Sequence, residues 1–73
     1  MTLGQRIQAL RKQHGLSQEG LGERLGVSRQ AISRWEMDGA VPEVDKLIAM
    51  ARLFGVSLNQ LLGVEEPEQP VSE

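Results

Sequence analysis

The sequence predicts an all-α domain of five short helices, and three observations support this class. Apolar residues recur every three or four positions, as at Leu3, Ile7 and Leu10, and they never alternate with a period of two for long. Residues that favour helix N-caps precede these periodic segments, and glycines follow most of them. The chain has 73 residues, which is enough for one domain with a small, well-packed core.

Each expected helix has a start and a stop signal. The first extends from about Thr2 to Gln13, with Thr2 as its N-cap and Gly15 just beyond its end. The other four begin after Ser17, at Ser28, after Pro42 and after Ser57. Glycines close the second, fourth and fifth helices, at Gly26, Gly55 and Gly63. The predicted buried stripe of the fourth helix is Val44, Leu47, Ile48, Ala51 and Phe54.

The last residues differ in composition from the rest. Residues 64–73, VEEPEQPVSE, contain two prolines and four glutamates. Such a segment has little to bury, so we expect a domain over residues 1–63 followed by a disordered acidic tail or linker.

The net charge of −2 conceals an asymmetry along the chain. Residues 1–35 carry six basic and two acidic residues, a net charge of +4, whereas residues 65–73 carry four glutamates and no base. A basic half of this kind is typical of a polyanion-binding protein, although a mixed, solvated surface explains the charge alone equally well.

The composition also excludes several classes of protein. The chain has no cysteine and one histidine, so disulfides and thiolate metal sites are excluded, and we expect no metal, no cofactor and no enzymatic activity. No apolar run approaches the roughly 20 residues of a membrane helix, and the first residues do not contain the uninterrupted apolar stretch of a signal peptide. We therefore expect a cytoplasmic protein without a membrane partner.

The segment QEGLGERLGVSRQAISRWEM, residues 18–37, has the pattern of a helix-turn-helix. Two helices of about eight residues flank the turn Gly26-Val27-Ser28. Gly22 is small where the second helix approaches closely, and Gly26 allows a positive φ at the turn. Ile32 and Trp35 supply the apolar bulk that faces back into the angle between the helices. We interpret Trp35 as core rather than as a base-stacking platform.

The segments LSQ, LGVSRQAISRWE and LFGVSLNQLL resemble the Cro/lambda-repressor type of helix-turn-helix domain, also called the xenobiotic-response-element family. The resemblance extends from Leu10 to Gly63. It implies a five-helix, lambda-repressor-like DNA-binding domain whose third helix enters the major groove of double-stranded DNA. It further implies a prokaryotic or phage transcriptional regulator, which we expect to be a repressor acting at the nucleoid.

The resemblance assigns roles to individual residues. The residues expected to read bases, or to contact adjacent phosphates, are Arg29, Gln30, Ser33 and Arg34. The residues expected to contact phosphates are Gln18, Ser28, Arg6 and Lys46. Arg11 and Glu36 resemble a pair that forms an internal salt bridge, which is a structural role together with those of Gly22, Gly26, Ile32 and Trp35.

The segment that follows the recognition helix departs from the family's pattern, and alternatives to a plain repressor stay open. Met37-Asp38-Gly39 stands where the family often has asparagine, glycine and a base, so a polar contact and a cation are missing and an acid is added near the phosphates. The affinity for DNA is then either modest or more dependent on a homodimer at a palindromic operator. The expected dimer surface is Leu58, Leu61, Leu62 and Val64, and the alternative is that these residues cap the core. The alternatives are a protein-interaction module, an antitoxin with a toxin partner, or the DNA-anchoring domain of a larger sensor with a missing C-terminal domain.

Overall fold

The computed structural model describes residues 1–64, which form five α-helices and no strand. The helices are α1 (Leu3–Gln13), α2 (Gln18–Leu25), α3 (Arg29–Glu36), α4 (Val44–Phe54) and α5 (Leu58–Leu62). The predicted all-α class is confirmed. The acidic tail predicted for residues 64–73 lies, from residue 65 onward, outside the described residues. Within residues 1–64, none of the helices combines the length and the apolar character needed to cross a bilayer.

Side-chain caps begin four of the five helices. The hydroxyls of the N-cap residues accept a hydrogen bond from the backbone N–H three positions later; these residues are Thr2, Ser17, Ser28 and Ser57. In α1 and α5 the glutamine at that third position also accepts from the backbone N–H of the N-cap residue, which completes a capping box. The exception is α4, whose N-cap Glu43 makes no side-chain cap. Local sequence therefore determines where most of these short helices begin.

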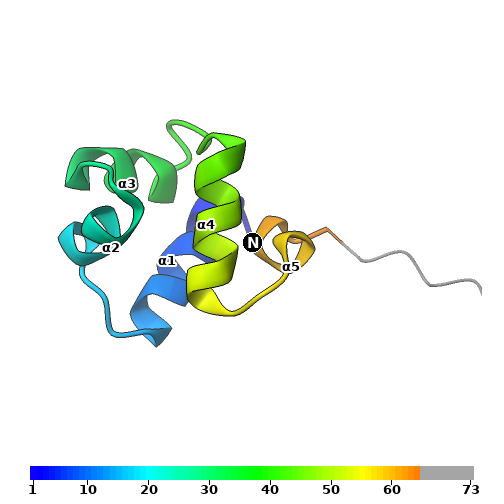
Figure 1. Ribbon diagram of the computed structural model, residues 1–73. Helices are drawn as coiled ribbons and strands as arrows, with labels where there is room; N and C mark the ends of the chain where they lie inside the picture. Colours follow the sequence, from blue (N-terminus) through cyan, green and yellow to red (C-terminus); the bar gives the residue numbers. More distant parts are fainter. Residues whose placement is uncertain (65–73) are drawn as a thin grey trace, which may run out of the picture.

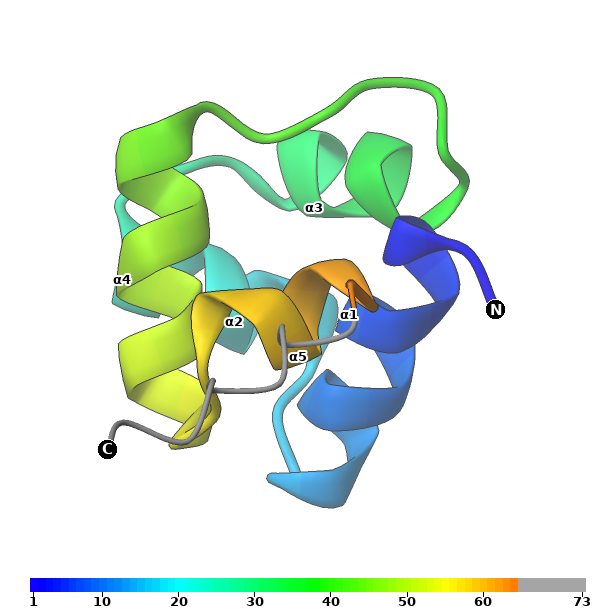
Figure 2. The same cartoon turned by 90° about the vertical axis from the view of Figure 1, so that its right-hand side faces the viewer.

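The helices pack around α1 and α4 (Figure 1). In that view α2 and α3 lie on one side of α4 and α5 lies on the other, with α1 behind. The turned view shows α3 running across one end of the molecule, near the start of α1 (Figure 2). Contacts of α1 with both α3 and α5, and of α4 with both α2 and α5, join the two sides. In Figure 1, α3 lies at the edge of the molecule, and the loop to α4 leaves from its end.

One apolar core lies between the helices. Its buried members are Ile7, Leu21, Leu25, Ile32, Trp35, Leu47, Met50, Ala51, Phe54 and Leu61. The prediction for α4 was wrong at two positions, because Val44 is 66% exposed and Ile48 is 39% exposed. The buried stripe of α4 consists instead of Leu47, Met50, Ala51 and Phe54. Ile48 projects about 100° further round the helix than Leu47, on a side that the other helices leave open.

Candidate nucleic-acid interface

The turn between α2 and α3 depends on two glycines. Gly26 has φ 71° and ψ 32°, the left-handed conformation, and its N–H donates to the Gly22 carbonyl. A Cβ at buried Gly22 would lie 2.6 Å from the Val27 carbonyl oxygen, which belongs to the backbone of the turn. Any larger residue would push α2 away from the turn that leads into α3. These contacts provide the physical reason for glycine at both positions.

The inner face of α3 anchors this helix to the core. Ile32 is fully buried and Trp35 is 8% exposed, and both belong to the core cluster. Trp35 is therefore a packing residue, as the sequence interpretation had it, and its ring is not available to stack on a base. With one face held in this way, the opposite face of α3 has a fixed orientation toward solvent.

The outer face of α3 presents hydrogen-bond donors. Arg29, Gln30 and Arg34 are exposed, and Ser33 is half-buried. These positions fall within about 140° of arc around the helix, and the arc contains two cations and no acid. Ser28 lies at the N-terminus, where its hydroxyl accepts a hydrogen bond from the Ala31 N–H at 3.1 Å. The four residues predicted to read bases thus share one surface, with Ser28 at its edge.

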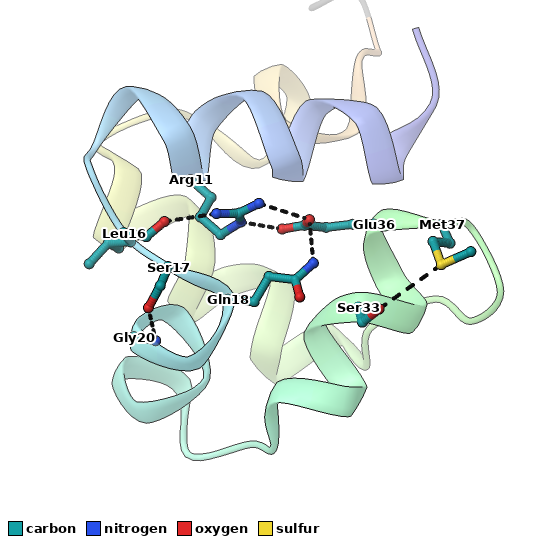
Figure 3. Close-up of polar contacts among 8 residues, drawn as sticks. All are labelled: Arg11, Leu16, Ser17, Gln18, Gly20, Ser33, Glu36 and Met37. Carbon is teal, nitrogen blue, oxygen red and sulfur yellow. Dashed lines mark hydrogen bonds and ion pairs between the residues drawn. The ribbon is translucent and has the colours of Figure 1, made fainter.

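A polar network behind this surface links three helices (Figure 3). The Arg11 guanidinium of α1 donates to both Glu36 carboxylate oxygens, from Nε to Oε2 at 2.6 Å and from Nη2 to Oε1 at 3.2 Å. Its Nη1 donates to the Leu16 carbonyl at 2.9 Å. Gln18 of α2 donates through Nε2 to Oε1 of Glu36 at 3.0 Å. The carboxylate at the end of α3 therefore positions the glutamine at the start of α2.

The structure separates Arg6 from the other predicted phosphate ligands. Its guanidinium lies against Gly63 at the end of α5 and donates to the Met1 carbonyl. Lys46 lies in the first turn of α4, half-buried, with Nζ 3.9 Å from the nearest Asp45 oxygen. Gln18 and Ser28 are each the first or capping residue of a helix in the motif, α2 and α3 respectively, whereas Arg6 is directed toward α5.

Asp38 has a role that the sequence interpretation missed. It adopts φ 60°, a left-handed conformation that aspartate tolerates better than most residues. Its Oδ2 accepts from the Thr2 hydroxyl at 2.6 Å and its Oδ1 accepts from the Gly4 N–H at 2.9 Å. These two donors, the hydroxyl first, hold the pKa of Asp38 below its ordinary value of 3.8. The acid that was expected near the phosphates therefore also binds the start of α1, where a negative charge interacts favourably with the helix dipole.

Among residues 1–64, no group of three or more histidine and carboxylate side chains is arranged to hold a metal ion. What the surface of α3 offers is a row of neutral and cationic donors on a rigid helix, suited to acceptors on a polyanion.

Comparison with known proteins agrees with this geometry. The helix-turn-helix family model HTH_3 matches residues 7–61. The chain belongs to this helix-turn-helix family. The expectation of the Cro/lambda-repressor type is confirmed, because the similar structures include phage repressor DNA-binding domains.

Three related proteins illustrate the similarity. The HTH-type regulator YobD of Bacillus subtilis is 36% identical over 69 residues, which cover 94% of this chain and 62% of YobD. The P22 c2 repressor, crystallised with a synthetic operator, has a TM-score of 0.82 at 35% identity. The matched region covers 89% of this chain and 98% of the repressor chain. SinR, a master regulator for biofilm formation crystallised with DNA, has a TM-score of 0.76 at 32% identity, over 84% and 98% of the two chains. The chain spans between about a third and two thirds of the length of the first curated relatives that it matches.

Proposed function

We propose that this helix-turn-helix domain binds double-stranded DNA in a sequence-specific manner and regulates transcription, with α3 in the major groove. One observation carries the proposal. Arg29, Gln30 and Arg34 form an exposed row of donors on the helix whose other face holds Ile32 and Trp35 in the core. Arginine pairs bidentately with guanine and glutamine with adenine, and Ser33 adds a short hydroxyl to the same face.

Phosphate contacts fix the position of α3 in this proposal. The amide nitrogen of Gln18 carries two hydrogens, and Glu36 accepts one of them. The second is then free to donate to a phosphate, together with the backbone N–H groups at the start of α2. Ser28 and Lys46 are the further candidates for phosphate contacts. Arg6 is a weaker candidate, because its guanidinium already donates to the Met1 carbonyl.

We further propose that the protein acts as a homodimer on a palindromic operator. One of the four residues expected at the dimer surface, Leu61, is instead fully buried in the core. Leu58 is 36% exposed and Val64 is 57% exposed. These exposed side chains, with half-buried Leu62, provide an apolar surface for a second subunit. Two recognition helices would then read half-sites about one DNA turn apart.

The phage repressors among the similar proteins favour repression as the direction of regulation, whereas one relative of 39% identity is a transcriptional activator. A repressor of this kind acts on chromosomal or phage DNA in the cytoplasm. The greater length of the relatives favours one second candidate, in which this module anchors a larger regulator or sensor to DNA. A pure protein-interaction module needs no row of donors on α3. An antitoxin would bind its own operator as well as a toxin, so it needs these donors as a plain repressor does.

Selection of duplexes from a random DNA library, followed by sequencing, tests the proposed function. We expect a palindrome to be enriched at near-physiological salt, since a dimer reads two half-sites. Enrichment of a single half-site would contradict the dimer and favour the anchoring module. Absence of enrichment even at low salt, where phosphate contacts are strongest, would overturn DNA binding as the function.

A further inference from the structure

Met37 is placed differently from the other two methionines. It is the C-cap of α3 and is 79% exposed. Met50 is fully buried. Met1 is also exposed, but it lies beside residues of α1 and α5. Positions 30, 33 and 37 are spaced so that they share one face of the helix. Met37 therefore lies one turn beyond Ser33 on the outer face of α3, in the place where the family often has asparagine.

The sulfur of Met37 is in contact with a residue of the proposed DNA surface. The Ser33 hydroxyl donates to its Sδ at 4.0 Å (Figure 3). A thioether sulfur is a weak acceptor, so this hydrogen bond competes poorly with a base or phosphate oxygen. In the reduced protein the Ser33 hydroxyl can therefore turn toward DNA.

We propose that Met37 is an oxidation site, and that its conversion to methionine sulfoxide by a peroxide weakens DNA binding. A lone pair of Sδ attacks one oxygen of hydrogen peroxide, so that an S–O bond forms as the O–O bond breaks. The proton on the oxygen now bound to sulfur passes to the departing hydroxide, which leaves the sulfoxide and one water. The sulfur is oxidised by two electrons and the peroxide is reduced by two. The proposal rests on the proposed function, because it needs α3 to be the helix that contacts DNA.

The sulfoxide changes the surface in two ways. Its oxygen is a far stronger acceptor than the thioether, so it holds the Ser33 hydroxyl and withdraws it from DNA. The same oxygen adds a negative dipole end beside phosphates, which are themselves acceptors. Exposure makes Met37 accessible to peroxide, while burial protects Met50 in the core.

The test exposes the protein to hydrogen peroxide and stops the reaction while Met50 is still unmodified, as judged by mass spectrometry of peptides. The probe is the duplex that the reduced protein enriches from the random library. We expect the Kd to rise about tenfold as Met37 is oxidised, which corresponds to losing one or two hydrogen bonds. Methionine sulfoxide reductases for both epimers should restore binding.

Met37→Leu is the matched control, because it keeps Met1 and Met50 and removes only the proposed site. We expect this variant to bind the duplex before and after peroxide with the same Kd. An equal loss of affinity in Met37→Leu, or full affinity in protein whose Met37 is oxidised, would overturn the oxidation site and leave DNA binding intact. If the reduced protein enriched no duplex, the proposed function and this proposal would both fail.

Discussion

Arg11 and Glu36 form a buried ion pair that joins α1 to the end of α3, with Nε and Oε2 2.6 Å apart. The two residues are 9% and 7% exposed. Removal of one partner leaves the other charge buried without compensation, whereas removal of both leaves a gap that apolar side chains can fill. The pair therefore constrains the position of α3. Loss of one partner is expected to destabilise the fold, unlike the loss of one partner from most surface ion pairs.

Glu36→Ala should destabilise the domain by about 3–5 kcal/mol, because Arg11 then remains buried without its carboxylate. The double variant Arg11→Met/Glu36→Leu should recover most of that loss. Urea denaturation followed by circular dichroism measures both effects. An unchanged unfolding midpoint for Glu36→Ala would refute the view that this pair is structural.

Gly22→Ala should also destabilise the domain, by about 1–3 kcal/mol, the usual range for overpacking. The added Cβ would lie 2.6 Å from the Val27 carbonyl oxygen, and backbone cannot move aside as a side chain can. Gly20→Ala is the matched control on the same helix. Its Cβ would lie 3.1 Å from the Ser17 hydroxyl oxygen, so we expect a much smaller change in the urea midpoint. Equal effects at the two positions would argue against a close approach at Gly22.

The parts of this structure that the sequence predicts well are the local ones. Hydroxyl caps such as Ser28 and the turn glycine Gly26 act through their own backbone neighbours, so their effect is visible in a short segment. Ile32 and Trp35 follow from helical periodicity, which identifies the inner face of α3 without knowledge of its neighbours.

The features that the sequence did not predict depend on which elements meet in space. Asp38 caps α1 across a separation of 34 and 36 residues from Gly4 and Thr2, a contact that no local pattern encodes. Ile48 satisfies the helical period yet faces solvent, because burial requires a covering helix on that side. For Asp38, the sequence did offer one signal of an unusual backbone conformation. It lies in an aspartate–glycine loop, and aspartate is among the few residues that tolerate a positive φ.

Asp38 should make the stability of the domain depend on pH. Its folded-state pKa lies below the ordinary value of 3.8, so the stabilisation is fully present above that value and is lost as the pH falls through the lower, folded pKa. At pH 7, Asp38→Ala should lower the urea midpoint, and the difference from wild type should shrink at acid pH. Glu23→Ala is the control, because Glu23 is an exposed acid within α2. A difference between wild type and Asp38→Ala that stays constant down to pH 3 would contradict this role.

Gln30 and Gln18 should separate base reading from phosphate binding. Gln30 is exposed on the outer face of α3, so Gln30→Ala should leave the fold intact and relax preference at one base-pair position, by about 1–3 kcal/mol of discrimination. Arg29→Ala should likewise leave the fold intact and relax the preference at a different base-pair position. Gln18 donates to Glu36 behind that face, and we propose that it donates its second amide hydrogen to a phosphate. Because phosphates are the same in every sequence, Gln18→Ala should weaken binding to all duplexes to a similar degree. Selection and sequencing with each variant, together with titrations on matched and mismatched duplexes, distinguish these outcomes. If Arg29→Ala and Gln30→Ala both kept the wild-type site preference, the assignment of base readout to these residues would be wrong.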